Sequence, residues 1–147
     1  MIANAAALGD VSVTGVSAEY NWCRAGGLLG SSAYLTHNCY ASGNVSLQDS
    51  AESVKNVYLG CLIGEQSGGV VVSGHYFNGA VLRCNGETQT VKATGSIPAS
   101  WYFDYNKITV HDSVTDAAFA AALNDGISES GLAETDAYLT SSGTFTS

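Results

Sequence analysis

The sequence predicts an all-β fold, namely a β-solenoid-like stack of 34–36-residue repeats with a short C-terminal helical cap. Three observations support this prediction. The composition is typical of a turn-rich β protein, because 17 of the 147 residues are Gly while Pro occurs once. Glycines recur at a nearly constant spacing over the first two thirds of the chain. Short runs rich in Val, Tyr and Leu lie between those turn residues. We therefore expect one domain over residues 1–147.

The charge balance limits the classes of partner. Charged residues are 12% of the chain, and acids outnumber bases 13 to 5, giving a formal charge of -8. Neutralising phosphates requires clustered Lys and Arg, so we expect no nucleic-acid partner. The same balance argues against docking on an anionic membrane. No stretch approaches the roughly 20 apolar residues that span a bilayer, so we expect no membrane insertion of this segment.

The repeat is visible in two pairs of segments. Residues 25–30 (AGGLLG) resemble 59–64 (LGCLIG), and residues 38–45 (NCYASGNV) align with 74–81 (GHYFNGAV). The second alignment places Gly9, Gly43 and Gly79 at spacings of 34 and then 36 in the numbering. It also places Tyr40 level with Tyr76, which predicts a ladder of stacked rings, and His75 in the position of Cys39.

Strand-like runs separate the turn residues within each repeat. A single unit of this kind cannot cover its own apolar face, and stacking on the next unit does so. The expected strands of the repeat region are Asp10–Thr14, Gly27–Leu29, Ala33–Ala41, Val57–Ile63 and Gly69–Phe77.

The segment Gly26–Gly30 followed by Asn38–Val45 resembles the GLUG motif of large bacterial surface proteins. That family includes adhesin-like proteins and the non-catalytic part of some immunoglobulin-A-specific metallopeptidases. The resemblance covers residues 8–82, and the second copy departs from the motif at Cys61 and at Gly74–His75. It implies an extracellular β-repeat segment without catalytic residues.

The last third of the chain differs from the repeats. Residues 83–112 predict further strands, at Glu87–Thr94 and Lys107–Val110. Residues 113–126 predict the capping helix, with Ser113–Asp116 at its start, an Ala-rich body over Ala117–Leu123 and Gly126 just past its end. We expect this helix to cover the open end of the stack. The tail over residues 138–147 is expected to be a loose strand or linker.

Cysteine and histidine do not form a recognisable site. The chain has no C-x-x-C pair among its four cysteines, Cys23, Cys39, Cys61 and Cys84. We expect at least two of them to be small buried thiols, and one unassigned disulfide between two of the four is the alternative. His37 and Cys39 are two residues apart, yet no second ligand pair follows at zinc-like spacing. We found no serine-nucleophile, H-E-x-x-H or phosphate-binding glycine motif. The sequence predicts no catalytic residues, no metal site and no cofactor.

The densest aromatic run is the best candidate for ligand binding. Trp101, Tyr102, Asp104 and Tyr105 combine flat apolar faces with a hydrogen-bond acceptor, which suits a sugar. Alternatively, Trp101, Phe103 and Tyr105 point inward and complete the core. Tyr20 and Trp22 are a weaker second candidate.

These observations together predict a non-enzymatic extracellular module of a bacterial surface protein, with an adhesive or spacer role. One alternative is a module that binds a host glycan or glycoprotein through the run at 101–105. The other is an accessory, non-catalytic segment of a secreted metallopeptidase, whose partners would be other parts of the same protein.

Overall fold

The computed structural model describes residues 2–16, 22–33, 35–49, 56–67, 73–95, 108–113 and 121–126. These residues are mostly β, with a single short helix among them. The strands form several small sheets, and most of their pairings are parallel. The all-β prediction is therefore confirmed at this level.

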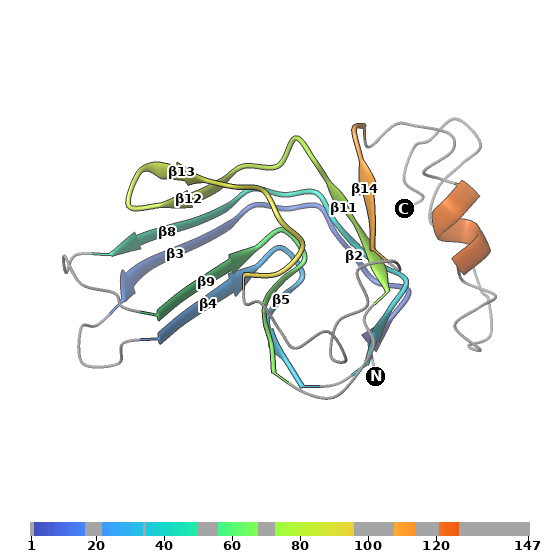
Figure 1. Ribbon diagram of the computed structural model, residues 1–147, viewed down its shortest axis with the longest axis horizontal. Helices are drawn as coiled ribbons and strands as arrows, with labels where there is room; N and C mark the ends of the chain where they lie inside the picture. Colours follow the sequence, from blue (N-terminus) through green and yellow to red (C-terminus); the bar gives the residue numbers. More distant parts are fainter. Residues whose placement is uncertain are drawn as a thin grey trace.

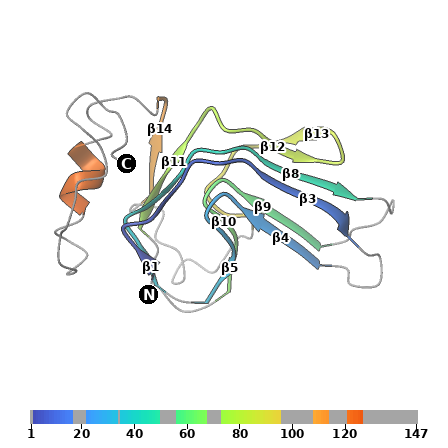
Figure 2. The same cartoon turned by 180° about the vertical axis from the view of Figure 1, so that it is seen from behind.

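The chain runs through three successive passes over the same set of sheets (Figures 1 and 2). The first pass contains β1 (Ile2–Ala3), β2 (Ala6–Ala7), β3 (Val11–Val16), β4 (Trp22–Gly26) and β5 (Leu29–Ser32). The second contains β6 (Thr36–His37), β7 (Cys39–Ala41), β8 (Val45–Asp49), β9 (Asn56–Gly60) and β10 (Ile63–Gln66). The third contains β11 (Gly74–Phe77), β12 (Leu82–Cys84) and β13 (Glu87–Gln89), and β14 (Ile108–His111) then begins a fourth.

Each strand of the first pass pairs in parallel with its counterpart in the second. Val11 lies opposite Val45 and Trp22 opposite Asn56, so the numbers of paired residues differ by 34 in both sheets, up to a register shift between Thr14 and Val16 at the end of β3. β1 with β6 and β5 with β10 keep the same step. Parallel pairing therefore begins at β1, earlier in the chain than residue 8, where the repeats were predicted to start. Figure 1 shows the result as β3 beside β8 and β4 beside β9.

One predicted strand divides into two because the chain bends in its middle. The run Val57–Ile63 becomes β9 and β10, with the bend at Cys61–Leu62. The first pass bends at the same level, where Gly27–Leu28 separates β4 from β5, so the predicted strand Gly27–Leu29 is wrong over its first two residues. The backbone N–H of Leu28 donates to the Leu62 carbonyl, so the two bends stack.

The third pass departs from the alignment made by sequence. His75 lies opposite Tyr40 and Tyr76 opposite Ala41, a step of 35, whereas Leu82 lies opposite Val45, a step of 37. The predicted Tyr40–Tyr76 ladder is therefore wrong, and Gly74 rather than His75 occupies the position of Cys39. Two residues have been added at the corner between β11 and β12, which shifts the register without breaking either strand pairing.

The three aligned glycines have different surroundings for the same reason. A Cβ on Gly43 would overlap the Gly9 carbonyl oxygen, so Gly9 and Gly43 stack as predicted. Gly79 lies in a turn with Asn78, and a Cβ there would meet the ring of Phe77 instead. The added residues of the third corner form this turn.

The core consists of two clusters between the sheets. The buried residues of the larger are Cys23, Ala25, Val45, Leu47, Leu59, Cys61, Ala80 and Leu82. Those of the smaller are Cys39, Ala41, Leu62, Ile63 and Ala93. Cys84 is half-buried at the edge of the larger cluster. The expectation that at least two cysteines are small buried thiols is confirmed, because Cys23, Cys39 and Cys61 are buried and all four cysteines are free thiols. Burial raises the pKa of the Cys39 thiol, and that of Cys61 to about 11, which keeps both thiols protonated at neutral pH.

Asparagine side chains link successive passes at one corner. Asn4 and Asn38 both have positive φ, 53° and 49°, a conformation that Asn tolerates better than most residues. The Asn38 Nδ2 group donates to Asn4 Oδ1 at 3.0 Å and to the Leu123 carbonyl at 3.0 Å. One buried amide thus joins the first pass, the second pass and the helix.

Asn38→Ala is expected to lower the free energy of unfolding by about 1–3 kcal/mol, because the substitution removes one buried and one part-buried hydrogen bond at a strained position. Urea unfolding of both proteins measures the difference. Asn85→Ala is the matched control, since Asn85 has the same φ of 49° on an exposed turn. Equal losses in the two variants would mean that the backbone conformation alone requires Asn.

A β-hairpin interrupts the parallel stack in the third pass. β12 pairs antiparallel with β13 across the turn at Asn85–Gly86, where φ is 49° and 84°. Two positive φ values in an Asn-Gly pair are typical of a tight hairpin turn. Of the predicted strand Glu87–Thr94, only β13 and an isolated bridge at Thr94 are present. β14 then returns to the parallel stack and pairs with β11, with Gly74 opposite Ile108.

The helix over 121–126 lies against the side of the stack. Besides its bond to Asn38 in the second pass, it lines a pocket with His75 of the third pass and Thr109 of the fourth. Residues 121–126 therefore lie beside the second, third and fourth passes, which differs from the predicted position over the open end. It includes Gly126, which was expected just beyond it. Residues 114–120 and the tail 138–147 lie outside the described residues.

Nothing in the described helical segment is long and apolar enough to cross a membrane.

Candidate functional site

The aromatic run predicted to bind ligand, Trp101, Tyr102, Asp104 and Tyr105, lies outside the described residues, as does Tyr20. Trp22, the other half of the weaker prediction, is described and stands at the start of β4.

An aromatic pair lies on the outer face of the β4–β9 sheet. Along β4 the side chains alternate, so Cys23 and Ala25 are buried while Trp22 and Arg24 are exposed. Tyr58 on β9 lies opposite Arg24 and is half-buried. The rings of Trp22 and Tyr58 have centroids 5.9 Å apart and planes inclined at 39°. Trp22 nevertheless remains 51% exposed.

Charged and hydroxyl groups surround this aromatic pair. The Arg24 guanidinium lies over the Trp22 ring, with Cζ 5.0 Å from the centroid. Its Nε donates to Glu65 Oε2 on β10, and Ser31 Oγ lies 3.5 Å from the same oxygen. We call Trp22, Arg24, Ser31, Tyr58 and Glu65 the aromatic face. It offers a flat apolar surface with hydrogen-bond donors and an acceptor held beside it.

A second group of polar residues lines a pocket of about 350 Å³ between the helix and the sheet β14-β11-β7-β2. Its walls are His37, Asn38, Ser73, His75, Thr109, Ala122, Asp125 and Gly126. We call it the lateral pocket.

A buried histidine pair borders the lateral pocket. His75 Nδ1 on β11 and His111 Nε2 on β14 are 3.0 Å apart and share a hydrogen bond, and each side chain is 9% exposed. Burial, and to a smaller extent the neighbouring His111, lowers the pKa of His75 to about 4. His75 is therefore neutral at physiological pH and is placed to stabilise the packing of β14 on β11.

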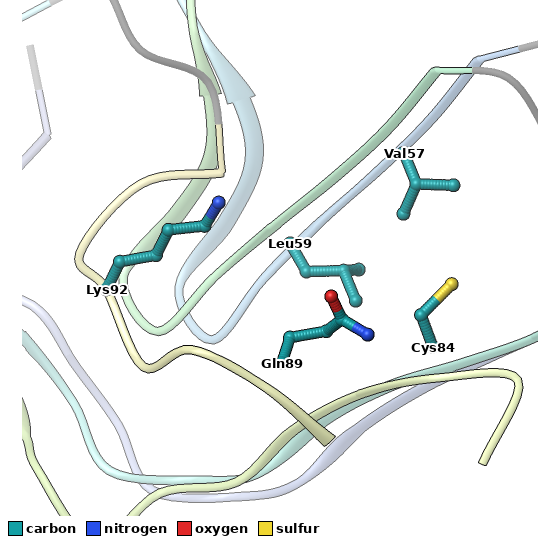
Figure 3. Close-up of a pocket in the computed structure, with 5 residues that line it drawn as sticks. All are labelled: Val57, Leu59, Cys84, Gln89 and Lys92. Atoms are coloured by element: carbon teal, nitrogen blue, oxygen red, sulfur yellow. The ribbon is translucent and has the colours of Figure 1, made fainter. Parts of the chain in front are cut away.

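A third, smaller hollow of about 140 Å³ lies between the edge of β9 and the hairpin β12–β13. Val57, Leu59, Cys84 and Gln89 lie close together there, with Lys92 further away on one side (Figure 3). Three apolar or weakly polar side chains and two polar ones thus line it, and its small volume limits any occupant to a few atoms.

His37 and Cys39, the residues considered as the start of a metal site, point to different places. The Cys39 thiol is fully buried and donates to the His37 carbonyl at 3.3 Å, whereas His37 lines the lateral pocket. Within the described ranges, no three His, Cys, Asp or Glu side chains gather where they could hold a metal ion.

Sequence reasoning missed two of these groupings. Trp22 was considered with Tyr20, its neighbour in sequence, whereas its structural partner is Tyr58, one repeat further along the chain. Extending the alignment of residues 25–30 with 59–64 upstream as far as Trp22 would have placed Arg24 opposite Tyr58. The spacing of His75 and His111, which is close to one repeat, is a similar signal.

Comparisons of this chain with protein-family models, with characterised proteins and with solved structures found no match. The resemblance to the GLUG motif therefore stays a prediction from residues 8–82.

Proposed function

We propose that this chain is a non-enzymatic repeat module of an extracellular bacterial surface protein, and that its passes form a β-solenoid with a spacer or adhesive role. The observation that carries the proposal is the step of 34 residues between the paired strands of the first two passes, which recurs in four pairings and changes only at the end of β3. The surface location and the bacterial source rest on the resemblance to the GLUG motif.

A constant step is what an elongating module requires. Each pass contacts only its neighbours, so stability grows as passes are added and the stack lengthens by about 4.8 Å per pass, the spacing of paired strands. The corner at Asp10, Asn44 and Val81 shows how one pass positions the next. Asp10 Oδ1 accepts from the Asn44 N–H at 2.8 Å, and Asn44 Oδ1 accepts from the Val81 N–H at 2.9 Å.

Duplication of one pass tests this proposal. A second copy of residues 11–44 inserted after Asn44 is expected to stack between the existing passes, because every inserted strand would find neighbours at the step that the first two passes share. Hydrogen exchange should show slow amides in the inserted strands, and small-angle scattering should show a particle longer by roughly 5 Å.

The control carries the residues of the 11–44 segment in scrambled order at the same position. It has equal length and composition but no matching strands, so its inserted amides should exchange rapidly. Fast exchange in the true duplication as well would contradict the solenoid proposal.

A further inference from the structure

We propose that the aromatic face is a saccharide-binding site, in which Trp22 stacks on the apolar face of a neutral β-linked hexopyranose while Arg24, Glu65 and Ser31 bind its hydroxyl groups. This inference deepens the adhesive role proposed above, and it names the class of ligand and the site.

The exposure of Trp22 is the first argument. Trp is usually largely buried, whereas Trp22 is 51% exposed even with the Arg24 guanidinium over its ring. Contacts with Arg24 and Tyr58 fix the orientation of this ring before any ligand arrives. A rigid, exposed indole gains free energy when an apolar surface covers it, and little side-chain entropy is lost on binding.

The shape of the face indicates a sugar. β-Configured glucose and galactose units carry several axial C–H groups on one side of the ring, and these form an apolar patch that matches a flat aromatic surface. Trp22 and Tyr58 stand on neighbouring parallel strands, and the centroids of their rings are 5.9 Å apart. That distance is close to the length of one hexose unit, so the two rings can contact successive units of one chain.

The polar groups indicate a neutral ligand. Sugar hydroxyls both donate and accept, and the face offers a guanidinium, a hydroxyl and a carboxylate in one hydrogen-bonded group. Arg24 and Glu65 balance each other in charge, and the whole chain carries a charge of -8. A polyanionic glycan would therefore be repelled at long range with no local excess of positive charge to compensate.

Fluorescence of Trp22 measures this binding directly. The chain contains two tryptophans, so the full chain with Trp101→Phe has Trp22 as its single indole. We expect a saturable change in its emission on titration with β-1,4-linked or β-1,3-linked glucohexaose. A sulfated heparin hexasaccharide should give no saturable change.

Variants locate the site by calorimetric titration with the oligosaccharide that binds. Trp22→Ala and Tyr58→Ala should weaken binding about tenfold or more, as expected for aromatic residues at the centre of an interface. Leu8→Ala is the matched control, because Leu8 is 49% exposed but lies outside the aromatic face. The affinity of this variant for the oligosaccharide should stay within about twofold of that of the parent chain. Circular dichroism confirms that each variant is folded.

Three outcomes would overturn the inference. In the first, the folded chain binds neither of the neutral hexasaccharides. In the second, Trp22→Ala binds with full affinity. In the third, Trp101→Ala loses binding while Trp22→Ala keeps it. None of these affects the duplication experiment, so failure of the saccharide site and failure of the repeat module are distinguishable.

Discussion

Gly43→Ala is expected to lower the free energy of unfolding by about 3–5 kcal/mol, enough to unfold much of the protein at 37 °C. Gly43 is buried at the corner between β7 and β8, where its backbone lies directly against the first pass. A Cβ there would overlap the Gly9 carbonyl oxygen and lie 3.0 Å from the Asp10 nitrogen. These are backbone atoms, so they can move away only if the two passes separate, and separation breaks the pairing of β3 with β8.

Gly9→Ala is the matched control for this substitution. Gly9 is the residue on which Gly43 stacks, yet no described atom lies within 4 Å of the position that its own Cβ would take. We expect its stability to change by less than about 0.5 kcal/mol. Thermal unfolding monitored by circular dichroism compares both variants with the parent. Similar midpoints for the two variants would contradict the close stacking of the passes.

Lowering the pH from 7 to 4 is expected to remove up to about 3 kcal/mol of stability through His75 alone. The pKa of His75 is about 4 in the folded chain and returns towards its ordinary value of 6.5 on unfolding. Between these two values the unfolded chain binds a proton that the folded chain does not. The His75 contribution is therefore fully present above pH 6.5 and is lost progressively as the pH falls towards 4.

The groups near His75 determine this behaviour. His111 on β14 shares its hydrogen bond, and a charge on His75 would be repelled by a charge on His111. His37 from β6 and Asp125 from the helix line the same lateral pocket. Since the carboxylates of the chain also titrate in acid, the informative quantity is the difference between two proteins.

Urea unfolding of the parent and of His75→Gln at pH 7, 6, 5 and 4 measures that difference. Glutamine keeps a polar side chain but cannot take up the proton, so its stability should fall less steeply with pH between 6.5 and 4. Parallel stability curves for the two proteins would show that His75 is not the group responsible.

The sequence was sufficient to predict the spacing of the passes but not the register of every strand. Gly9 and Gly43 are one full repeat apart and stack at one corner, because the strands before and after that corner are paired at the same step. Tyr40 and Tyr76 were aligned by identity, whereas the structure places His75 opposite Tyr40. Strand pairing tolerates added residues at a corner, as at Asn78–Gly79, so identical residues at similar spacing need not be neighbours.

The candidate site depends on the contact between Trp22 and Tyr58, which the order of residues in the sequence does not show. The run Trp101–Tyr105 was predicted as a binding site because its aromatic residues lie close together in sequence. Trp22 and Tyr58 are distant in sequence and become neighbours only through the pairing of β4 with β9. The helix was predicted from its alanines, whereas its contact with the stack includes a hydrogen bond from the buried amide of Asn38 and the burial of Leu123. Helix propensity carries no information about such a partner.

The uniform pairing distance also constrains how the chain folds. Each parallel pairing of the first two passes closes a loop of the same length, so the chain entropy lost in joining two strands is nearly the same from one sheet to the next. The first joining of two passes is then the slow event, because it orders a long loop before any neighbouring strand is in place. Every later strand adds to an existing edge. We therefore expect folding to start from a nucleus of two adjoining passes, with a high contact order and a rate in the millisecond-to-second range, and to proceed by winding outward from it.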